Sequence, residues 1–234
     1  MKLIVAGATG LVGSEVIRQA LQNKDVTEVI ALARKPVHIE GNNSPSKLKC
    51  VVIRDYAEYS DEVKAELAGA NACIWTVAIT PFRSGSFDFK EVKRVCQDCT
   101  LAGFKTIYEA GPARPFRFLY FSAEGTPRDS SKRPMLMGDY QVMRCETENM
   151  VLQFPTQYEG VQVCIAQPGV VTNSKTWPRA VLASLFSVVN LFTRVIPNVT
   201  RSQLSAAVLN QAIYGFDKET LLNNDLVRIG QAKD

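Results

Sequence analysis

Several residue types and patterns are scarce in this chain of 234 residues, and each scarcity excludes a class of function. Histidine occurs once, as His38, and the spacing of Cys96 and Cys99 is not repeated, so we expect no metal or redox centre. No basic run is interleaved with aromatic residues and the net charge is only +4, which argues against a nucleic-acid partner. The uncharged segment 180–192 is shorter than the ~20 apolar residues of a membrane-spanning helix, so we expect no membrane span.

The composition is otherwise that of an ordinary globular protein. Hydrophobic residues make up 46% of the chain and charged residues 21%, and the length suits one α/β domain with a large core. No repeat or linker divides the chain, so we predict a single domain over residues 1–234. The first residues enter an apolar strand at once, which leaves no room for a signal peptide, and most cysteines lie in apolar segments. Both features favour a cytoplasmic protein with reduced cysteines.

The most informative motif is the sequence Gly-Ala-Thr-Gly-Leu-Val-Gly at residues 7–13. It follows the apolar run Leu3–Ala6 and precedes an amphipathic helical pattern, which predicts a strand, a tight turn and a helix. Gly7 allows the turn, Gly10 lets the backbone approach a pyrophosphate, and Gly13 lets the helix pack close to the sheet. The helix N-terminus adds unpaired N–H groups and a partial positive charge. We therefore expect a dinucleotide to contact Gly7, Thr9, Gly10, Leu11, Val12 and Gly13.

The end of the second predicted strand indicates which dinucleotide is bound. The apolar run 29–33 is followed by Arg34 and Lys35, where an NAD-binding protein usually carries an acid. A guanidinium suits a 2′-phosphate through charge and bidentate hydrogen bonds. The sequence therefore favours NADP(H) over NAD(H), with Arg34 as the main contact and Lys35 as the weaker candidate. The alternative is that Arg34 is a solvated surface residue.

The rest of the chain alternates strands and helices, which predicts a Rossmann-type, doubly wound parallel sheet of the α/β class. The expected further strands cover residues 49–54, 72–77, 116–121, 161–166 and 226–229. The expected helices cover residues 63–67, 87–108, 140–154 and 202–214. In the long helix we expect Val92, Val95, Cys96 and Cys99 to face the core and Lys90, Lys93, Arg94 and Asp98 to be exposed.

Ligands of such sheets bind outside the carboxyl ends of the strands, so residues at these ends are candidates for the site. Ser122 follows the strand at 116–121, and the other candidates for cofactor contacts at strand ends are Asp55, Thr76, Val77, Ala78, Pro168 and Gly169. Asp55 either approaches the adenine or only ends its strand.

Four motifs together carry a resemblance to a known family. They are residues 7–13, Phe118-Leu-Tyr-Phe-Ser122, Tyr140-Gln-Val-Met-Arg144 and Gln167-Pro-Gly169. Over essentially its whole length, the chain resembles the atypical, extended short-chain dehydrogenase/reductases, close to the small NmrA-like and Tat-interacting-protein-like branch that is common in fungi. The resemblance implies that Ser122 hydrogen-bonds a substrate carbonyl and that Tyr140 transfers the proton. The cation four residues after this tyrosine would hold the nicotinamide ribose and lower the pKa of Tyr140.

The sequence departs from that family at the cation, because position 144 is arginine instead of lysine. Arg144 keeps the charge and the spacing of one helical turn from Tyr140, but its pKa is too high for it to relay a proton. Carbonyl reduction therefore remains open and is not assured.

Three functions remain in view. The first is an NADP(H)-dependent oxidoreductase that acts on a small, rather apolar carbonyl or alcohol, with secondary metabolism as one setting. The second is an isomerase, epimerase or cyclase of the same fold that holds the cofactor. The third is a non-catalytic regulator that senses NADP(H). We expect residues from about 170 to 234 to form a cap on the substrate side. The apolar segment 180–192 would be a buried helix, a roof over the substrate or a subunit interface, in a monomer or homodimer.

Overall fold

The fold was analysed in a computed structural model that describes residues 1–234 except 39–44, 130, 132–133, 135–136, 173–196 and 232–234. The expected apolar helix at 180–192 lies outside the described residues.

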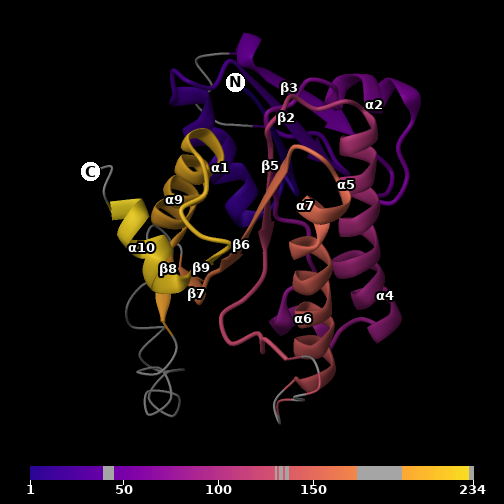
Figure 1. The fold of residues 1–234 in the computed structure, drawn as a ribbon, viewed down its shortest axis with the longest axis vertical. Helices are drawn as coiled ribbons and strands as arrows, with labels where there is room; N and C mark the ends of the chain where they lie inside the picture. Colours follow the sequence, from indigo (N-terminus) through magenta and orange to yellow (C-terminus); the bar gives the residue numbers. More distant parts are fainter. Residues whose placement is uncertain (39–44, 130, 132–133, 135–136, 173–196, 232–234) are drawn as a thin grey trace.

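A seven-stranded sheet with the order β3-β2-β1-β4-β5-β6-β9 forms the centre of the molecule (Figure 1). Every neighbouring pair of strands in it is parallel. The predicted doubly wound parallel sheet is therefore confirmed. The strands are β1 (Lys2–Ala6), β2 (Glu28–Ala33), β3 (Leu48–Val52), β4 (Ala72–Trp75), β5 (Phe116–Phe121), β6 (Val161–Gln167) and β9 (Thr220–Leu222). A separate small sheet pairs β7 (Val170–Thr172) with β8 (Asn198–Thr200).

Helices cover both faces of the large sheet (Figure 1). One layer consists of α1 (Leu11–Gln22), α9 (Arg201–Tyr214) and α10 (Asn223–Gln231). The other consists of α2 (Asp61–Leu67), α4 (Phe89–Lys93), α5 (Cys99–Glu109), α6 (Gly138–Leu152) and α7 (Phe154–Gln157). Two short helices, η1 (Pro45–Lys47) and α3 (Pro81–Ser84), lie in connections, and the π-helical segment η2 (Arg94–Asp98) joins α4 to α5.

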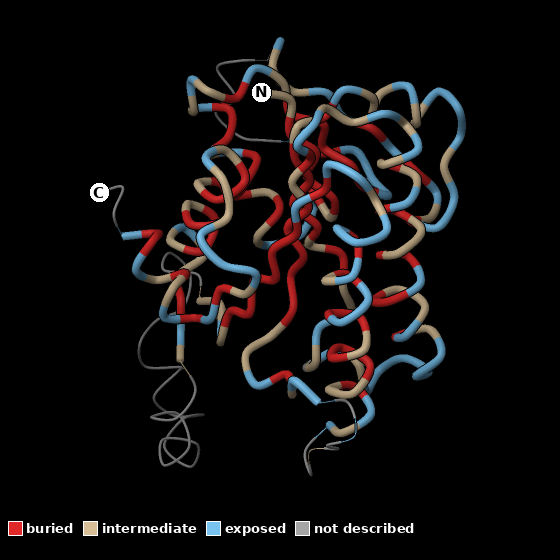
Figure 2. The backbone as a smooth tube through the Cα atoms, in the orientation of Figure 1, coloured by how far each residue is buried: buried red, intermediate tan, exposed pale blue. Residues whose placement is uncertain are grey.

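The strands are apolar along their whole length because both faces of the sheet are covered. In β5, Phe116, Phe118 and Tyr120 belong to the core under α5 and α7, while Leu119 and Phe121 belong to the core under α1 and α9. Figure 2 shows this as a buried centre between two layers whose outer surfaces are exposed. The alternation follows from the two-residue period of a strand.

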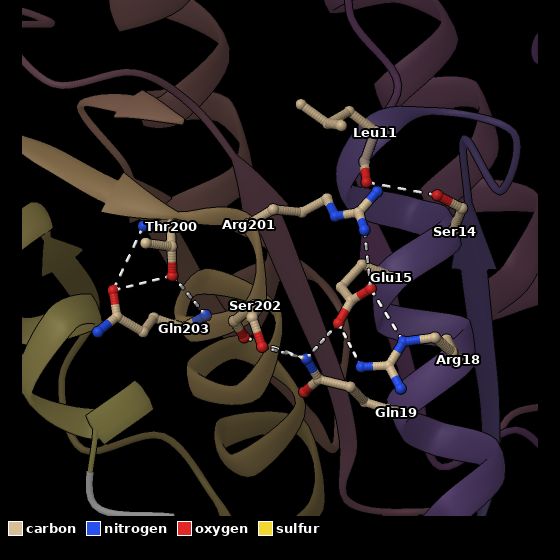
Figure 3. A network of polar contacts seen from close by, with 9 residues as sticks. All are labelled: Leu11, Ser14, Glu15, Arg18, Gln19, Thr200, Arg201, Ser202 and Gln203. Carbon is tan, nitrogen blue, oxygen red and sulfur yellow. Dashed lines mark hydrogen bonds and ion pairs between the residues drawn. The ribbon is translucent and has the colours of Figure 1, made fainter. Parts of the chain in front are cut away.

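A network of polar side chains joins α1 to the start of α9 (Figure 3). The buried carboxylate of Glu15 accepts two hydrogen bonds from Arg18 and one from Gln19 and lies 3.4 Å from Arg201. Gln19 also donates to the backbone carbonyl of Ser202 at 3.1 Å. Two helices that are distant in sequence are therefore held together at the carboxyl edge of the sheet.

Two expectations about secondary structure need correction. Residues 226–229 form part of helix α10, and the last strand is Thr220–Leu222. Leu226 and Ile229 lie three residues apart, and both are buried on one face of this helix. The long helix expected at 87–108 is present from Phe89 to Glu109, but its centre is the π-helical segment, and Arg94 there is half-buried instead of exposed.

Five of the six cysteines are buried and Cys50 is exposed. None of the helices within the described residues is long and apolar enough to cross a membrane.

Candidate functional site

The glycine turn connects β1 to α1 with the geometry that its sequence predicts. Gly7 has a φ of +80° and donates from its backbone N–H to the carbonyl of Leu32 at 3.1 Å. A side chain on Gly7 would lie 2.4 Å from the Thr76 hydroxyl, and one on Gly13 would lie 2.5 Å from the Gly7 carbonyl oxygen. Glycine is therefore required at both positions, because the turn is left-handed at Gly7 and α1 begins against it.

A cavity of about 240 Å³ opens beside this turn, at the carboxyl ends of the first four strands. It brings together eight of the predicted cofactor residues: Gly7, Thr9, Gly10, Arg34, Asp55, Thr76, Val77 and Ala78. Leu11, Val12 and Gly13 continue from its rim as the first turn of α1. Its other lining residues are Tyr56, Ile79, Arg83, Phe87, Glu91, Arg94, Val95 and Cys99. Lys35, Tyr140, Arg144, Pro168 and Gly169 do not line it.

Tyr56 is a residue of this site that sequence reasoning missed. Its buried hydroxyl accepts from the N–H of Gly7 at 3.2 Å and donates to the carbonyl of Leu32 at 3.3 Å. Its ring packs edge-on against Trp75, with centroids 5.7 Å apart. Tyr56 thus fixes the glycine turn to the end of β2. The only signal in the sequence was its position directly after Asp55, at the end of a strand.

Arginines and carboxylates meet along one wall of the cavity. Arg94 donates to both oxygens of Glu91, at 2.8 and 2.9 Å, and to Asp55 at 2.9 Å. Arg34 is exposed at the end of β2 and forms no hydrogen bond or ion pair with a residue that the structure describes. Burial raises the pKa of Tyr56, and the charge of Arg34 opposes this shift. The hydrogen bond from Arg94 lowers the pKa of Glu91, and the charge of Arg34 adds to that shift.

Tyr140 lies at the start of α6, where it packs with Val92, Cys96 and Met143 next to Ala78 and Ile79. Its hydroxyl donates to the carbonyl of Ile79 at 3.0 Å, so it lies beside a segment that lines the cavity. Burial raises the pKa of Tyr140, and the charge of Arg144 opposes this only in part. The lowering of its pKa that the resemblance implies is therefore not found.

Arg144 is enclosed behind Tyr140, with 2% of its surface exposed. One guanidinium nitrogen donates to the carbonyl of Phe121, and the guanidinium carbon lies 4.9 Å from the centre of the Tyr120 ring. The other two nitrogens, Nε and Nη1, have no hydrogen-bond partner among the described residues. The expected contact between Arg144 and a cofactor ribose would therefore require its side chain to move or the surrounding residues to open.

Ser122 extends the pairing of β5 with β6, because its N–H donates to the carbonyl of Ala166 at 2.8 Å. Its buried hydroxyl lies 3.4 Å from that of Thr126 and is close enough to Glu148 to oppose the rise in the pKa of that carboxyl. Gln167 donates to both oxygens of Glu148 at 2.9 Å. Burial raises the pKa of Glu148, although these hydrogen bonds and the charge of Arg144 oppose the shift. Glu148 is a second residue near the predicted site that the sequence analysis missed.

Pro168 and Gly169 follow β6 and are fixed by neighbouring backbone. The Pro168 carbonyl accepts from Glu124 at 2.9 Å, and the N–H of Gly169 donates to the Asn223 side chain at 3.0 Å. A side chain on Gly169 would lie 1.8 Å from the carbonyl oxygen of Pro197. Gly169 is therefore needed for the close approach of the segment that leads into β8.

Among the described residues there is no group of three or more histidine, cysteine or acidic side chains that could hold a metal. A wider depression of about 810 Å³ lies at the opposite, amino-terminal edge of the sheet, between the start of β6 and residues 214–219. None of the predicted site residues lines it.

A parallel sheet of this order, with a glycine turn after β1 and a cavity at the strand ends, defines a Rossmann-type nucleotide-binding protein with the short-chain dehydrogenase/reductase fold. The chain belongs to the NAD(P)H-binding family, whose model matches residues 7–183. The resemblance drawn from the motifs is thereby confirmed at the level of family and fold.

Two curated relatives are similar to part of the chain. Leucinostatins biosynthesis cluster protein T of Purpureocillium lilacinum is 40% identical over 77 residues, which are 32% of this chain and 27% of that protein. Protein FMP52, mitochondrial, of Candida albicans is 28% identical over 93 residues, which are 39% of this chain and 40% of that protein. The chain thus matches less than half of the length of either relative.

Solved structures with the same fold cover almost the whole chain. A dTDP-glucose 4,6-dehydratase from Streptomyces venezuelae, with NAD and TYD bound, superimposes with a TM-score of 0.70 at 19% identity, over 99% of this chain and 80% of that one. A UDP-glucose 4-epimerase from Thermotoga maritima gives 0.69 at 15% identity, over 99% and 82%. A short chain dehydrogenase/reductase from Saccharomyces cerevisiae gives 0.67 at 14% identity, over 97% and 98%. At these identities the likeness concerns the fold.

Proposed function

We propose that this chain binds NADP(H) in preference to NAD(H) and uses it as an oxidoreductase on a small, rather apolar carbonyl or alcohol. The observation that carries the cofactor preference is the position of Arg34. It lines the cavity beside the glycine turn and has no hydrogen bond or ion pair with a described residue, so its guanidinium is available to an anion. The similarity to a biosynthesis cluster protein supports secondary metabolism as the setting.

The residues around the glycine turn fit a dinucleotide. Gly10 caps α1 without a side chain, so an anion can reach the first amides of this helix, which have no acceptor within the helix. Leu11, Val12 and Gly13 would supply these N–H groups to the pyrophosphate. The cofactor would extend along Thr76, Val77 and Ala78 toward Tyr140. The next residue, Ile79, also lines the cavity, and its carbonyl accepts the hydrogen bond from the Tyr140 hydroxyl.

In the proposed reaction the cofactor supplies the hydride, and side chains of this chain handle the substrate oxygen. Ser122 would hydrogen-bond the carbonyl, and Tyr140 would donate the proton to its oxygen as the carbon is reduced. Burial raises the pKa of Tyr140 and so opposes release of its proton, and the positive charge of Arg144 partly offsets this. Arg144 would stabilise the resulting phenolate through its charge.

The enclosure of Arg144 favours a second candidate, a protein that binds NADP(H) without redox turnover. Arg144 donates to the Phe121 carbonyl, and Tyr140 donates to the Ile79 carbonyl, so both groups are engaged within the protein. This candidate includes an isomerase, epimerase or cyclase that retains its cofactor, as well as a regulator that senses NADP(H). The absorbance of NADPH during incubation with a panel of carbonyl compounds separates the two candidates. A fall in absorbance indicates the oxidoreductase, and a constant absorbance favours the second candidate.

Titration calorimetry with NADPH and NADH tests the cofactor preference. We expect NADPH to bind more tightly, and we expect Arg34→Ala to weaken NADPH binding by roughly the 1.5–3 kcal/mol of a hydrogen bond to a charged group. NADH binding should change little in this variant. Lys35→Ala is the matched control, because this neighbouring cation does not line the cavity. Equal affinities for the two cofactors in the unmodified protein would overturn the preference.

A further inference from the structure

We propose that Arg94 is a specificity-determining residue of the cofactor site, which acts by neutralising Asp55 and Glu91 so that the adenosine end of the cavity accepts a 2′-phosphate. The inference rests on the proposed binding of NADP(H). It gives Arg94 a positioning and electrostatic role and leaves direct contact with the 2′-phosphate to Arg34.

The contacts of Arg94 show how it is held. Its Nε and Nη2 donate to the two carboxylate oxygens of Glu91, and its Nη1 donates to Asp55. All three guanidinium nitrogens are therefore engaged with carboxylates, and the planar group is fixed against the wall of the cavity. Cys99 lies beside the same pair, 3.5 Å from Asp55 and 3.7 Å from Arg94. An arginine held in this way is poorly placed to leave its partners for a ligand.

Both carboxylates are charged at neutral pH, and both face the cavity. The hydrogen bond from Arg94 lowers the pKa of Glu91. Burial opposes ionisation of Asp55, but hydrogen bonds from the Ala57 N–H, Arg94 and Cys99 bring its pKa below the ordinary value. Without Arg94, the cavity that Arg34 lines would carry two carboxylates with no arginine hydrogen-bonded to them.

A π-helical segment of the chain holds Arg94 at this position. Arg94 begins the π-helical segment between α4 and α5, and such segments widen a helix by one residue per turn and occur often at functional sites. Glu91 precedes it in α4, whereas Asp55 lies beyond the end of β3, 39 residues earlier. Arg94 thus connects this helical segment to the residues that follow β3, and Arg94, Glu91 and Asp55 all line the cavity.

The ion pairs of Arg94 affect how the site discriminates between ligands with and without a 2′-phosphate. A 2′-phosphate bound to Arg34 would lie in the same cavity as the Glu91 carboxylate, because both side chains line it. Neutralisation of Glu91 by Arg94 removes the repulsion that this phosphate would otherwise meet. A ligand that lacks the 2′-phosphate would be much less sensitive to the same charge.

The test uses two probes, 2′,5′-ADP and 5′-AMP, so that the 2′-phosphate is examined without any enzymatic turnover. We expect Arg94→Met to weaken 2′,5′-ADP binding about tenfold relative to 5′-AMP, and less at high salt. Adding Glu91→Gln to Arg94→Met should restore most of this ratio, because it removes the uncompensated carboxylate. Lys93→Ala is the matched control, since it removes an exposed positive charge from the adjacent position. Circular dichroism confirms that each variant folds.

The outcomes separate the inference from the function on which it rests. If the unmodified protein binds neither probe, the proposed function fails and the inference fails with it. If it prefers 2′,5′-ADP but Arg94→Met leaves that preference unchanged, only the inference is overturned. Loss of preference that Glu91→Gln does not restore would also overturn it, because Arg94 would then act as a direct ligand or as a purely structural residue.

Discussion

Tyr140 is the residue on which a catalytic role of this chain depends most. Its hydroxyl is buried beside the cavity-lining segment at Ile79, and Arg144 lies one helical turn further along α6. We expect Tyr140→Phe to reduce turnover by about 10²–10⁴-fold, the usual contribution of a proton-transfer group. Binding of NADPH should remain nearly intact. The measurement is NADPH oxidation with whichever carbonyl compound proves to be a substrate, alongside calorimetry.

The control for this prediction is Tyr158→Phe, which removes a hydroxyl from the aromatic cluster of Phe104, Tyr108 and Phe154, away from the cavity. Near-normal turnover in Tyr140→Phe would rule out its role as the proton donor.

Arg144→Lys should be tolerated if the reaction is ordinary carbonyl reduction. Arg144→Ala should lower both the rate and the stability of the protein. It leaves a void beside Tyr120, and it removes the positive charge that lies near the buried Glu148.

Single residues also show the limit of prediction from sequence at this site. The glycine turn and the position of Arg34 beside it were predictable, because both depend on the strands that immediately precede them. Arg94 was expected to be exposed, and this was wrong. Its partner Asp55 is distant in sequence, and the π-helical segment in which Arg94 lies leaves no pattern in the sequence. Tyr56 and Glu148 were missed because their partners, Gly7 and Gln167, belong to other parts of the fold.

At the scale of elements, the contact between α1 and α9 ties the cofactor-binding helix to the C-terminal part of the chain. Glu15 is buried there, and burial disfavours its charge, yet hydrogen bonds from Arg18 and Gln19 and the charges of Arg18 and Arg201 lower its pKa overall. A carboxyl whose pKa is lowered in the folded state stabilises the fold above its unfolded-state pKa. This contribution is lost as the pH falls through the folded-state value.

We therefore expect Glu15→Gln to lower the free energy of unfolding at pH 7 by about 1–2 kcal/mol. The difference from the unmodified protein should shrink as the pH is lowered below 4.5, the ordinary pKa of this carboxyl. Urea unfolding across this range measures it. Glu109→Gln serves as the control, because its pair with Lys105 is exposed and such pairs contribute little. A loss that is the same at every pH would contradict the assignment to the charge of Glu15.

The strands and helices themselves were largely predictable. The buried strands of a parallel sheet are continuous apolar runs, so β5 was placed at its observed bounds, Phe116–Phe121, and α9 within one residue. The error at 226–229 arose because a short apolar run does not distinguish a strand from a buried helix turn. The structure resolves it through β9, which already completes the sheet immediately before this segment.

At the scale of the whole molecule, the family and the fold are established, and the chemistry is proposed. The sheet order, the glycine turn and the match over residues 7–183 establish a member of the NAD(P)H-binding family. Ile79 lines the cavity beside that turn, and its carbonyl accepts the hydrogen bond from the candidate proton donor Tyr140. This arrangement makes one continuous site from Arg34 to Tyr140 the central claim.

A crystal structure of the protein with NADP⁺ tests this claim most directly. We expect the pyrophosphate on the amides of Leu11, Val12 and Gly13, the 2′-phosphate on Arg34, and the nicotinamide beside Ala78 and Tyr140. Arg94 should keep its contacts with Asp55 and Glu91. A complex in which the 2′-phosphate makes no contact with Arg34, or in which the nicotinamide points away from Tyr140, would contradict the account.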